Sequence, residues 1–319
     1  MTASVPATDS RGGNRPTLRV GFVIYAGAAP SRRTIEGQLL LAFLRAEREL
    51  GIDGRVLYVN RDPTEALQSL ARQRYDLVIA ALVSDTDSVD RVARAFPHVR
   101  FLLPDLSIQA LQYPLKNVQG TVYRAEEAGY LAGYLAALME HRRKGKHIIS
   151  AVGGYPYPGV TRWIVGYKPG ARKADPHVVV RVDYSDDFAN ATKCERVAHS
   201  QISAGSGVVF NVAGACGLGA LKAAKEQKVW GIGVDVDESF LGRHILTSAV
   251  INLDRGLFES IRDFTRGRLP TGGNTVYDLR NGNVGLGRIS PDVPNAFVRQ
   301  VGAIRRAIIA GRIRVPRVS

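Results

Sequence analysis

Continuous apolar runs alternate with helix-like segments along almost the whole chain, and this alternation restricts the fold more than any other feature. The first apolar run covers residues 18–26, and residues 34–50 follow it with apolar positions at helical spacing. The apolar runs lack the strict apolar–polar alternation of a half-exposed strand. Such runs are typical of parallel strands that helices cover on both faces. The chain is therefore predicted to be an α/β protein built on parallel sheets.

The alternation occurs twice, which predicts two similar halves. A strongly helical segment at residues 125–141 follows the first series, and the apolar run at residues 146–154 starts the second. A length of 319 residues suits two domains of ordinary size. Two doubly wound units that face each other leave a cleft at the carboxyl ends of their strands, where small ligands bind.

Three local patterns give more specific expectations. Gly129 and Gly133 lie four residues apart on one face of a predicted helix and are interpreted as close-packing positions. Residues 274–287 are predicted to form a β-hairpin with Asn281-Gly282 at its turn. Residues 292–312 then have the pattern of a closing helix.

The net charge of +14 raises the question of a nucleic-acid or anionic partner. The charges are scattered, however, and the densest basic runs, at residues 141–144 and 305–317, carry few aromatic residues for base stacking. No nucleic acid is therefore expected as a partner. No run of about 18 apolar residues occurs. Residues 1–17 are expected to be a disordered tail without the apolar core of a signal peptide, which leaves open a cytosolic protein or a removed signal.

The segment 208–237 resembles a phosphate- or sugar-binding corner. An apolar run ends at the glycine-rich turn that begins at Gly214, a helix pattern follows, and the next apolar run ends at Asp235. An acidic residue about 20 positions after such glycines suits a ribose contact, so an NAD-dependent enzyme is one interpretation. The glycine order is GxxGxG, however, and not GxGxxG. Asp235 as the cap of a helix is the structural alternative.

Other strand ends supply further candidates. Phe210 precedes the glycine turn, and Asp105 ends the corresponding run of the first half. Trp163, with Tyr155 and Tyr157 before it, follows the run at residues 146–154 and could stack on a ring. For the aromatic residues, core packing remains the alternative. No catalytic constellation or metal-binding spacing is found, which predicts a binding protein and not an enzyme.

Several stretches together resemble a known family. These are "GVVFNVAGACGLGALKAAKEQKVWGIGVDVDESFL", "VGGYPYPGVTRWIVGYKPGARKADP", "AEEAGYLAGYLAALM" and "ILTSAVINLDRGLFESI". They are similar to the basic membrane protein family, the PnrA-like substrate-binding proteins of ABC transporters. The resemblance implies a type I periplasmic-binding-protein fold, with two doubly wound parallel-sheet lobes joined by a crossing hinge. We expect lobe 1 at residues 18–122 plus about 250–272, and lobe 2 at residues 123–249 plus about 273–319.

The family's usual ligand is a purine nucleoside, and the resemblance implies roles for individual residues. Asp235 matches the aspartate that holds the ribose, and Phe210 matches an aromatic residue that stacks on the base. Asp105 and Gly214 match further pocket positions. Four more residues complete the predicted ligand-binding set: Tyr25, Ser31, Trp163 and Asn211. No cofactor is implied.

The chain departs from the family pattern at two places. The family's first-loop aromatic residue and amide are replaced by Pro30 and Ser31, and its lysine by Ile251. Loss of a stacking ring removes roughly 1–3 kcal/mol, by analogy with nucleic-acid platforms. The fold expectation stands, and both a nucleoside and a different small molecule remain open as the ligand.

The expected partner is an ABC permease, with the chain itself a monomer outside the cytoplasm, membrane-anchored or periplasmic. A sensor with the same fold, cytosolic if Met1 is the true start, is the alternative. Cys194 lies in the helix before the Phe210 strand and Cys216 in the turn after it. A disulfide between them would suit an extracytoplasmic compartment, and two buried free thiols are the alternative.

Overall fold

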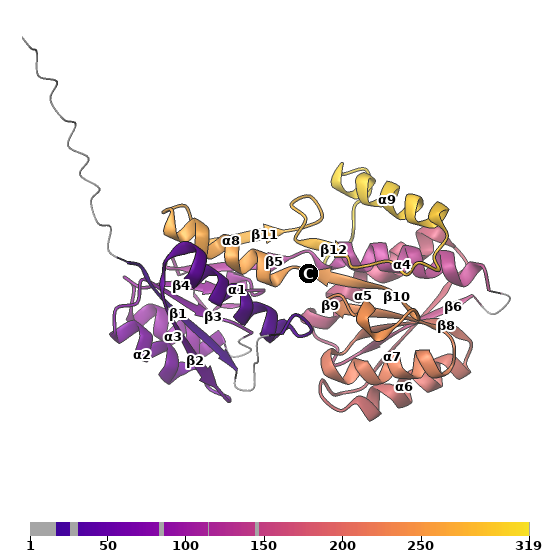
Figure 1. The fold of residues 1–319 in the computed structure, drawn as a ribbon, viewed down its shortest axis with the longest axis horizontal. Helices are drawn as coiled ribbons and strands as arrows, with labels where there is room; N and C mark the ends of the chain where they lie inside the picture. The colour runs from indigo at the N-terminus through magenta and orange to yellow at the C-terminus, as the bar shows by residue number, and fades with distance from the viewer. Residues whose placement is uncertain (1–16, 26–30, 83–85, 114, 144–146, 319) are drawn as a thin grey trace, which may run out of the picture.

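The computed structural model describes residues 17–25, 31–82, 86–113, 115–143 and 147–318 of the 319-residue chain. Almost all of the predicted tail at residues 1–17 lies outside these ranges. The described chain forms two lobes, each with its own six-stranded sheet, that lie side by side (Figure 1). We define lobe 1 as the elements around the first sheet and lobe 2 as those around the second.

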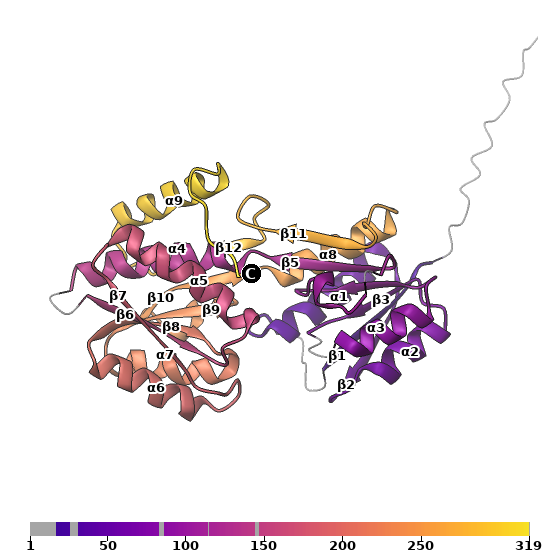
Figure 2. The same cartoon turned by 180° about the vertical axis from the view of Figure 1, so that it is seen from behind.

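The sheet of lobe 1 has the strand order β11-β5-β4-β3-β1-β2, with all neighbours parallel. Its strands are β1 (Arg19–Tyr25), β2 (Asp53–Val59), β3 (Leu77–Ala80), β4 (Arg100–Leu103), β5 (Val118–Tyr123) and β11 (Gly273–Tyr277). The helices α1 (Ile35–Leu50) and α8 (Leu253–Thr265) pack together, as do α2 (Thr64–Arg72) and α3 (Thr86–Ala95). The two pairs cover opposite faces of the sheet (Figures 1 and 2).

Lobe 2 repeats this strand order as β12-β10-β9-β8-β6-β7, but its edge strand β12 is antiparallel to β10. Its strands are β6 (Ile148–Gly153), β7 (Val179–Tyr184), β8 (Ser206–Val212), β9 (Trp230–Asp235), β10 (Ile245–Ile251) and β12 (Val284–Leu286). Its helices are α4 (Ala125–His141), α5 (Pro158–Ala174), α6 (Ala191–Ser203), α7 (Gly217–Glu226) and α9 (Asn295–Ile309). Short 3-10 turns are η1 (Ile108–Ala110) in lobe 1, and η2 (Gly214–Cys216) and η3 (Ser239–Leu241) in lobe 2.

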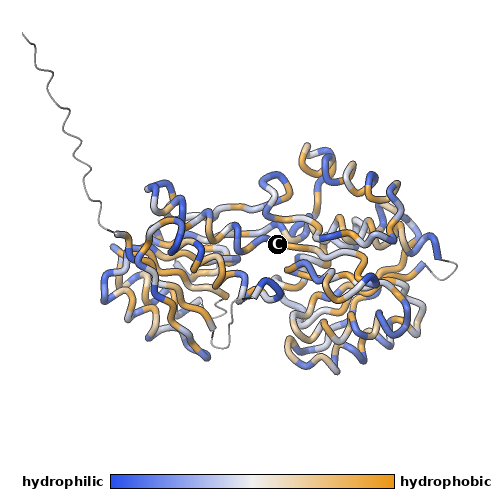
Figure 3. The backbone as a smooth tube through the Cα atoms, viewed as in Figure 1, coloured by the Kyte–Doolittle hydropathy of each residue, from blue (hydrophilic) through white to orange (hydrophobic). Residues whose placement is uncertain are grey.

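Both sheets are doubly wound, which confirms the predicted fold class. The apolar runs become central strands with every residue buried, such as β6 and β8. Figure 3 shows hydrophobic residues along the strands inside each lobe and hydrophilic residues on the outer helices. Among the described residues, no helix combines the length and apolar character needed to cross a bilayer.

Three connections join the lobes, and they lie together (Figure 1). The chain passes from β5 to α4, from β10 back to α8, and from β11 to β12. The Arg124 amide donates to the Tyr277 carbonyl at 2.8 Å, and the Asn252 amide donates to the Asn283 carbonyl at 2.8 Å. The rings of Tyr123 and Tyr277 stack with centroids 4.9 Å apart. These contacts make the crossings one hinge of paired backbones.

The region of β11 and β12 differs from the sequence prediction. β11 pairs in parallel with β5 of lobe 1, and β12 pairs antiparallel with β10 of lobe 2. The two strands therefore form no hairpin, and β11 does not belong to lobe 2 as the boundary near residue 273 implied. The turn at Asn281-Gly282, where Gly282 has φ 76°, links two sheets. A local turn signal predicts a reversal of the chain, but it does not determine the partner of each strand.

Glycines bring α4 and α5 into direct backbone contact. A Cβ at Gly129 would lie 2.1 Å from the Trp163 carbonyl oxygen, and one at Gly133 would lie 2.0 Å from that of Tyr167. On the facing helix, a Cβ at Gly166 would lie 1.8 Å from the Glu126 carbonyl oxygen. The interpretation of Gly129 and Gly133 as close-packing positions is confirmed. This contact fixes the position of α5, whose first turn reaches the candidate site.

We expect Gly133→Ala to destabilise the folded chain by about 1–3 kcal/mol, because the added methyl meets a backbone carbonyl that cannot move alone. The steric cost should exceed the roughly 1 kcal/mol that alanine gains over glycine in helix propensity, so the net change remains destabilising. Urea unfolding measures the change. Gly302→Ala in α9 is the control, since its Cβ would meet nothing closer than the Arg306 Nη1 at 3.6 Å. Equal stability of Gly133→Ala and the parent chain would contradict the close-packing role.

Candidate ligand-binding site

Two acidic residues stand at strand ends with the same backbone conformation. Asp105 follows β4 in lobe 1 with φ 57°, and Asp235 ends β9 in lobe 2 with φ 63°. Non-glycine residues rarely adopt this left-handed region, which concentrates at functional sites. The Asp105 amide donates to the Thr121 Oγ1 at 3.0 Å, which fixes the turn after β4. The strand-end positions predicted from the sequence thus present two carboxylates at the carboxyl edges of the sheets.

Arg162, in the first turns of α5, joins the lobes at these carboxylates. Its Nη1 donates to Asp105 Oδ1 at 2.8 Å, and its Nη2 donates to Asp105 Oδ2 at 2.6 Å. The two side chains are only 18% and 15% exposed. A bidentate, largely desolvated pair of this kind is stronger and more directional than a surface ion pair.

The sequence prediction did not include Arg162 in the site, although one signal was present. A cation near a helix N-terminus is disfavoured by the helix dipole, so a nearby carboxylate would stabilise an arginine there. The partner is supplied by the other lobe, and this contact between lobes is visible only in the folded chain.

Burial and charge together shift the titration of this group. Burial raises the pKa of Asp235 to about 7; Arg162 opposes the rise, while Asp105 and Glu36 add to it. Burial alone would lower the pKa of Arg162, but Asp105 and then Asp235 outweigh it and raise that pKa above its ordinary value. Asp105 and Asp235 thus share the Arg162 guanidinium, and Glu36 lies close enough to Asp235 to raise its pKa, so the group favours a neutral or cationic ligand over an anionic one.

The two rings predicted to face a ligand lie in the core instead. Phe210 is fully buried, and its ring centroid lies 5.0 Å from that of Tyr167 on α5. Trp163 is almost fully buried, at the contact of α5 with α4. β8 is covered on both faces, so a ring near its end packs against a helix and offers no face to a ligand. Both positions are therefore corrected to core residues.

A different set of rings is exposed at this edge of lobe 2. The Phe188 ring centroid lies 5.3 Å from that of Tyr155 and 5.9 Å from that of Tyr157. These three side chains are 37–48% exposed and come from the loops after β6 and β7. Burial raises the pKa of Tyr157, Arg162 opposes the shift, and Asp235 and Asp105 add to it. Tyr157 therefore lies within electrostatic reach of the carboxylate group.

The glycine turn lies against the same rings. Gly214 has φ 55°, and a Cβ there would lie 3.5 Å from the Phe188 carbonyl oxygen. The Cys216 amide donates to that carbonyl at 2.9 Å. The backbone of η2 and the aromatic loop thus support each other.

Asn211, part of the predicted ligand set, is used inside the protein. Its Oδ1 accepts from the Ala213 amide at 2.9 Å, and its Nδ2 donates to Glu238 Oε2 at 3.3 Å. A Cβ at Gly217 would overlap the Asn211 side chain, so this glycine makes room for it. Glu238, which the sequence prediction missed, also accepts from the Val234 amide at 3.2 Å, and burial raises its pKa to about 7. Asn211 therefore shapes the turn and does not face a ligand.

Of the remaining predicted positions, Ser31 and Tyr25 belong to lobe 1 and Ile251 to lobe 2. Ser31 is half-buried, and its Oγ accepts from the Arg33 amide at 3.1 Å. Tyr25 ends β1, and its side chain, like Pro30, lies outside the described part. Ile251 is buried in β10 opposite Val284. The Arg33 guanidinium lies 4.8 Å from the Phe240 ring centroid, a second contact between the lobes.

A disulfide joins Cys194 in α6 to Cys216 in η2, with 5.6 Å between their Cα atoms. Both residues are fully buried. The bond ties the turn that follows β8 to the helix that precedes β8. It thus holds the Gly214 turn, and through the Cys216 amide also the Phe188 loop, in place.

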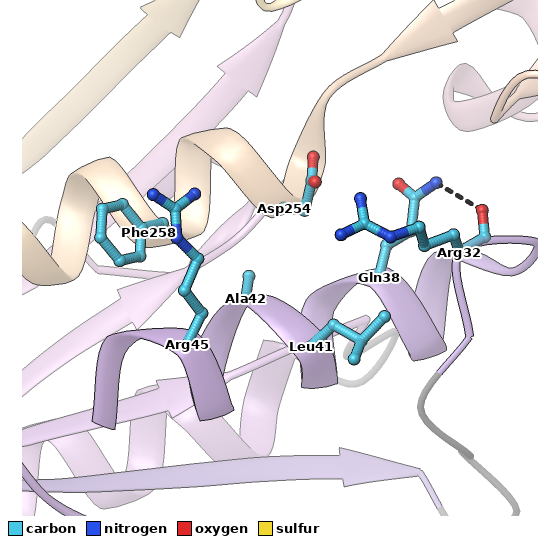
Figure 4. Close-up of a pocket in the computed structure, with 7 residues that line it drawn as sticks. All are labelled: Arg32, Gln38, Leu41, Ala42, Arg45, Asp254 and Phe258. Carbon is cyan, nitrogen blue, oxygen red and sulfur yellow. Dashed lines mark hydrogen bonds between the residues drawn. The ribbon is translucent and has the colours of Figure 1, made fainter. Parts of the chain in front are cut away.

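Two pockets lie outside this edge. One, of about 120 Å³, lies between α1 and α8 and is shown in Figure 4, where the Arg45 guanidinium stands 4.0 Å from the Phe258 ring centroid. The other, of about 390 Å³, lies between α9 and the strands β10 and β12 and is lined mainly by apolar residues and glycines. The first is smaller than ordinary ligand sites. The second reaches their size but has little of the convergent polar chemistry found at Asp105, Arg162 and Asp235.

Comparison with known proteins agrees with this architecture. The family model described as "ABC transporter substrate-binding protein PnrA-like" matches residues 40–319. The ABC transporter nucleoside-binding protein BmpA of Lactococcus lactis subsp. cremoris is 30% identical over 277 residues, which cover 80% of this chain and 75% of that protein. Basic membrane protein B of Borrelia garinii subsp. bavariensis is 28% identical over 256 residues, with 78% and 72% covered.

A solved solute-binding protein of an ABC transporter system from Aeropyrum pernix K1 has the same fold. Its TM-score is 0.78 at 21% identity, with 95% of this chain and 94% of that chain covered. This similarity confirms the type I periplasmic-binding-protein fold. Since the family model covers most of the chain, the chain belongs to the PnrA-like family of ABC transporter substrate-binding proteins.

Proposed function

We propose that the chain binds a purine nucleoside between its lobes and delivers it to an ABC permease. Membership of the family implies a small-molecule ligand and a permease partner. The observation that carries the choice of ligand is the acidic group around Arg162, beside three exposed rings at the same edge of lobe 2. The relative from Lactococcus lactis that is named as nucleoside-binding supports the same choice.

Each part of a nucleoside has a chemical partner at this edge. Carboxylate oxygens accept hydrogen bonds from a ribose diol, which suits Asp235. The exposed rings of Tyr157 and Phe188 offer faces for a purine, a contact worth about 1–3 kcal/mol by analogy with base stacking. Asp105 and the backbone of the Gly214 turn supply further polar groups, and Ser31 and Tyr25 are proposed to border the ligand from lobe 1.

The charge balance predicts which relatives of a nucleoside are rejected. A nucleoside monophosphate carries two negative charges near neutral pH and would place them beside Asp105, Asp235 and Glu36. Like charges at short range in a partly desolvated site cost several kcal/mol. We therefore propose a site for nucleosides and not for nucleotides.

Thermal unfolding with added ligand tests the proposal. Adenosine, guanosine or inosine at 100 times its Kd should stabilise the folded chain by about 2.7 kcal/mol. That gain raises the Tm of a domain of 150–250 residues by roughly 5–11 °C. Ribose alone and adenosine monophosphate are the controls and should shift the Tm little. Absence of a shift with every nucleoside would contradict the ligand and leave the family and the fold unchanged.

The setting of this function is also proposed. The buried disulfide favours an extracytoplasmic location, because reducing compartments rarely retain such bonds. One chain supplies both lobes and the hinge, so a monomer suffices to enclose a ligand. In this proposal the lobes close on the ligand by rotating about the hinge at the ends of β5, β10 and β11. The boundaries between the lobes lie at these crossings.

A further inference from the structure

Three potential metal ligands converge at the end of lobe 2 opposite the proposed nucleoside site. His141 is the last residue of α4, His147 directly precedes β6, and Asp175 directly follows α5. One ligand atom from each lies within 4.8 Å of the others. The carboxyl end of β6 leads to the aromatic loop, whereas this cluster lies at its amino end, so the two sites are separated by the length of the sheet.

One of the two distances to Asp175 equals the separation of ligands in a tetrahedral site, and the other is the distance of a hydrogen bond. The Nδ1 of His147 lies 2.9 Å and the Nδ1 of His141 lies 3.4 Å from Oδ2 of Asp175. Two ligands of a tetrahedral zinc ion, each about 2.0–2.2 Å from it, are separated by about 3.4 Å. We propose that His141, His147 and Asp175 bind a divalent transition-metal ion of the zinc type, with water as the remaining ligand. Imidazole and carboxylate donors suit such an ion.

The surroundings hold these ligands in place. Asp175 is buried, and its Oδ1 accepts from the His177 amide at 2.9 Å, so Oδ2 stays directed at the histidines. His147 has φ 51°, a conformation that costs energy for a non-glycine residue and is found mainly at constrained or functional positions. These features fix two of the three ligands before an ion arrives.

Neighbouring carboxyl groups also affect how strongly this cluster attracts a cation. Glu140, next to His141, is buried, and no partner of its Oε1 is found among the described residues. Its other oxygen pairs with the Arg143 guanidinium at 3.5 Å, which offsets the positive charge of this arginine. The buried Asp175 and Glu140 thus give this end of lobe 2 two carboxyl groups beside two imidazoles.

Binding requires a change of tautomer. Without metal, each histidine can donate its Nδ1 proton to Asp175; a metal ion takes the Nδ1 lone pair, so the proton must reside on Nε2. The two side chains are 68% and 38% exposed, so protons can exchange with solvent.

A second triad, of Glu195, His199 and Glu226, already holds a cation of the protein itself. The Lys222 ammonium lies 3.4 Å from Glu226 and also contacts Glu195. A metal ion there would have to displace this ammonium. The triad therefore serves as the matched control for the proposed site.

Cobalt binding to the full, tag-free chain after treatment with EDTA tests the site. We expect one Co²⁺ per chain with the strong visible absorption of tetrahedral coordination, displaced by ZnCl₂. His141→Ala/His147→Ala should weaken binding by more than the roughly 10–100-fold that loss of an outer-shell partner costs. His199→Ala should bind as the parent does. His141→Ala alone removes one ligand and changes only an exposed side chain, so it should weaken binding without affecting the fold. Circular dichroism verifies that each variant is folded.

Saturable binding that persists in His141→Ala/His147→Ala, or that disappears in His199→Ala, would overturn the assignment. Absence of saturable Co²⁺ and Zn²⁺ binding by the parent chain would overturn the site itself. Nucleoside binding is measured in parallel with and without EDTA. Because the two sites lie at opposite ends of β6, failure of one leaves the other intact.

Discussion

Asp235→Asn should weaken nucleoside binding by about 10- to 100-fold at pH 8. An ionised carboxylate accepts from both ribose hydroxyls, and hydrogen bonds to a charged group are worth about 1.5–3 kcal/mol. Asparagine keeps one acceptor oxygen and loses the charge. It also tolerates the left-handed backbone at this position better than most residues do, so the turn is preserved. Isothermal titration with the nucleoside of highest affinity measures the change.

The same substitution should remove a pH dependence of the parent chain. Burial raises the pKa of Asp235 to about 7 in the ligand-free protein. Ribose hydroxyls stabilise the ionised form and lower that pKa in the complex, so binding releases a proton below pH 7. At one pH unit below the pKa only about one carboxyl in eleven is ionised, so the parent's affinity should be about tenfold lower at pH 6 than at pH 8. Asp235→Asn should show a nearly flat profile.

Asp237→Asn is the matched control two residues further on. Its oxygens accept from the Ser239 amide at 3.1 Å and the Arg288 amide at 3.2 Å, away from Arg162. This variant should keep both the parent's affinity and its pH profile. Unchanged affinity of Asp235→Asn at pH 8 would exclude the ribose contact. A flat parent profile with a weakened variant would instead contradict the raised pKa.

Loss of the disulfide should lower stability by about 3 kcal/mol. The bond closes a loop between residues 22 positions apart, and constraining the unfolded chain over such a length gives this magnitude. For a domain of 150–250 residues, that corresponds to a Tm decrease of roughly 6–12 °C. Calorimetry of Cys194→Ala/Cys216→Ala without reductant measures it. The double variant leaves no thiol to react, and it keeps a small apolar side chain at both positions of this Ala-rich cluster.

A reducing agent provides the internal control for this prediction. It should lower the Tm of the parent chain toward that of the double variant and leave the double variant unchanged. Reduction should also weaken nucleoside binding, since Cys216 supports the Phe188 loop through its amide. Titration of two free thiols in denatured, unreduced protein would contradict the bond.

Part of the candidate site followed from local sequence patterns and part did not. Asp105 and Asp235 were identified because each ends an apolar run, and strand ends of parallel sheets meet at one edge. The prediction that Phe210 faces a ligand was wrong, because the ring is buried in the core. An aromatic residue among apolar neighbours gives the same sequence pattern whether its ring faces a helix or a ligand. Phe188 and Arg162 were missed because their neighbours come from other loops and, for Arg162, from the other lobe.

The sequence by itself determined the fold class, the family and the acidic strand ends. These features depend on periodicity and on short motifs, and each such pattern is complete within one short segment of the sequence. The tertiary structure alone decided that β11 and β12 enter different sheets, which rings are exposed, and that Arg162 bridges the lobes to Asp105. Each of these outcomes depends on segments that are far apart in the sequence. Such segments bury a side chain away from water, or supply the strand or charged group that it pairs with. Burial and charge pairing between distant segments are properties of the packed chain.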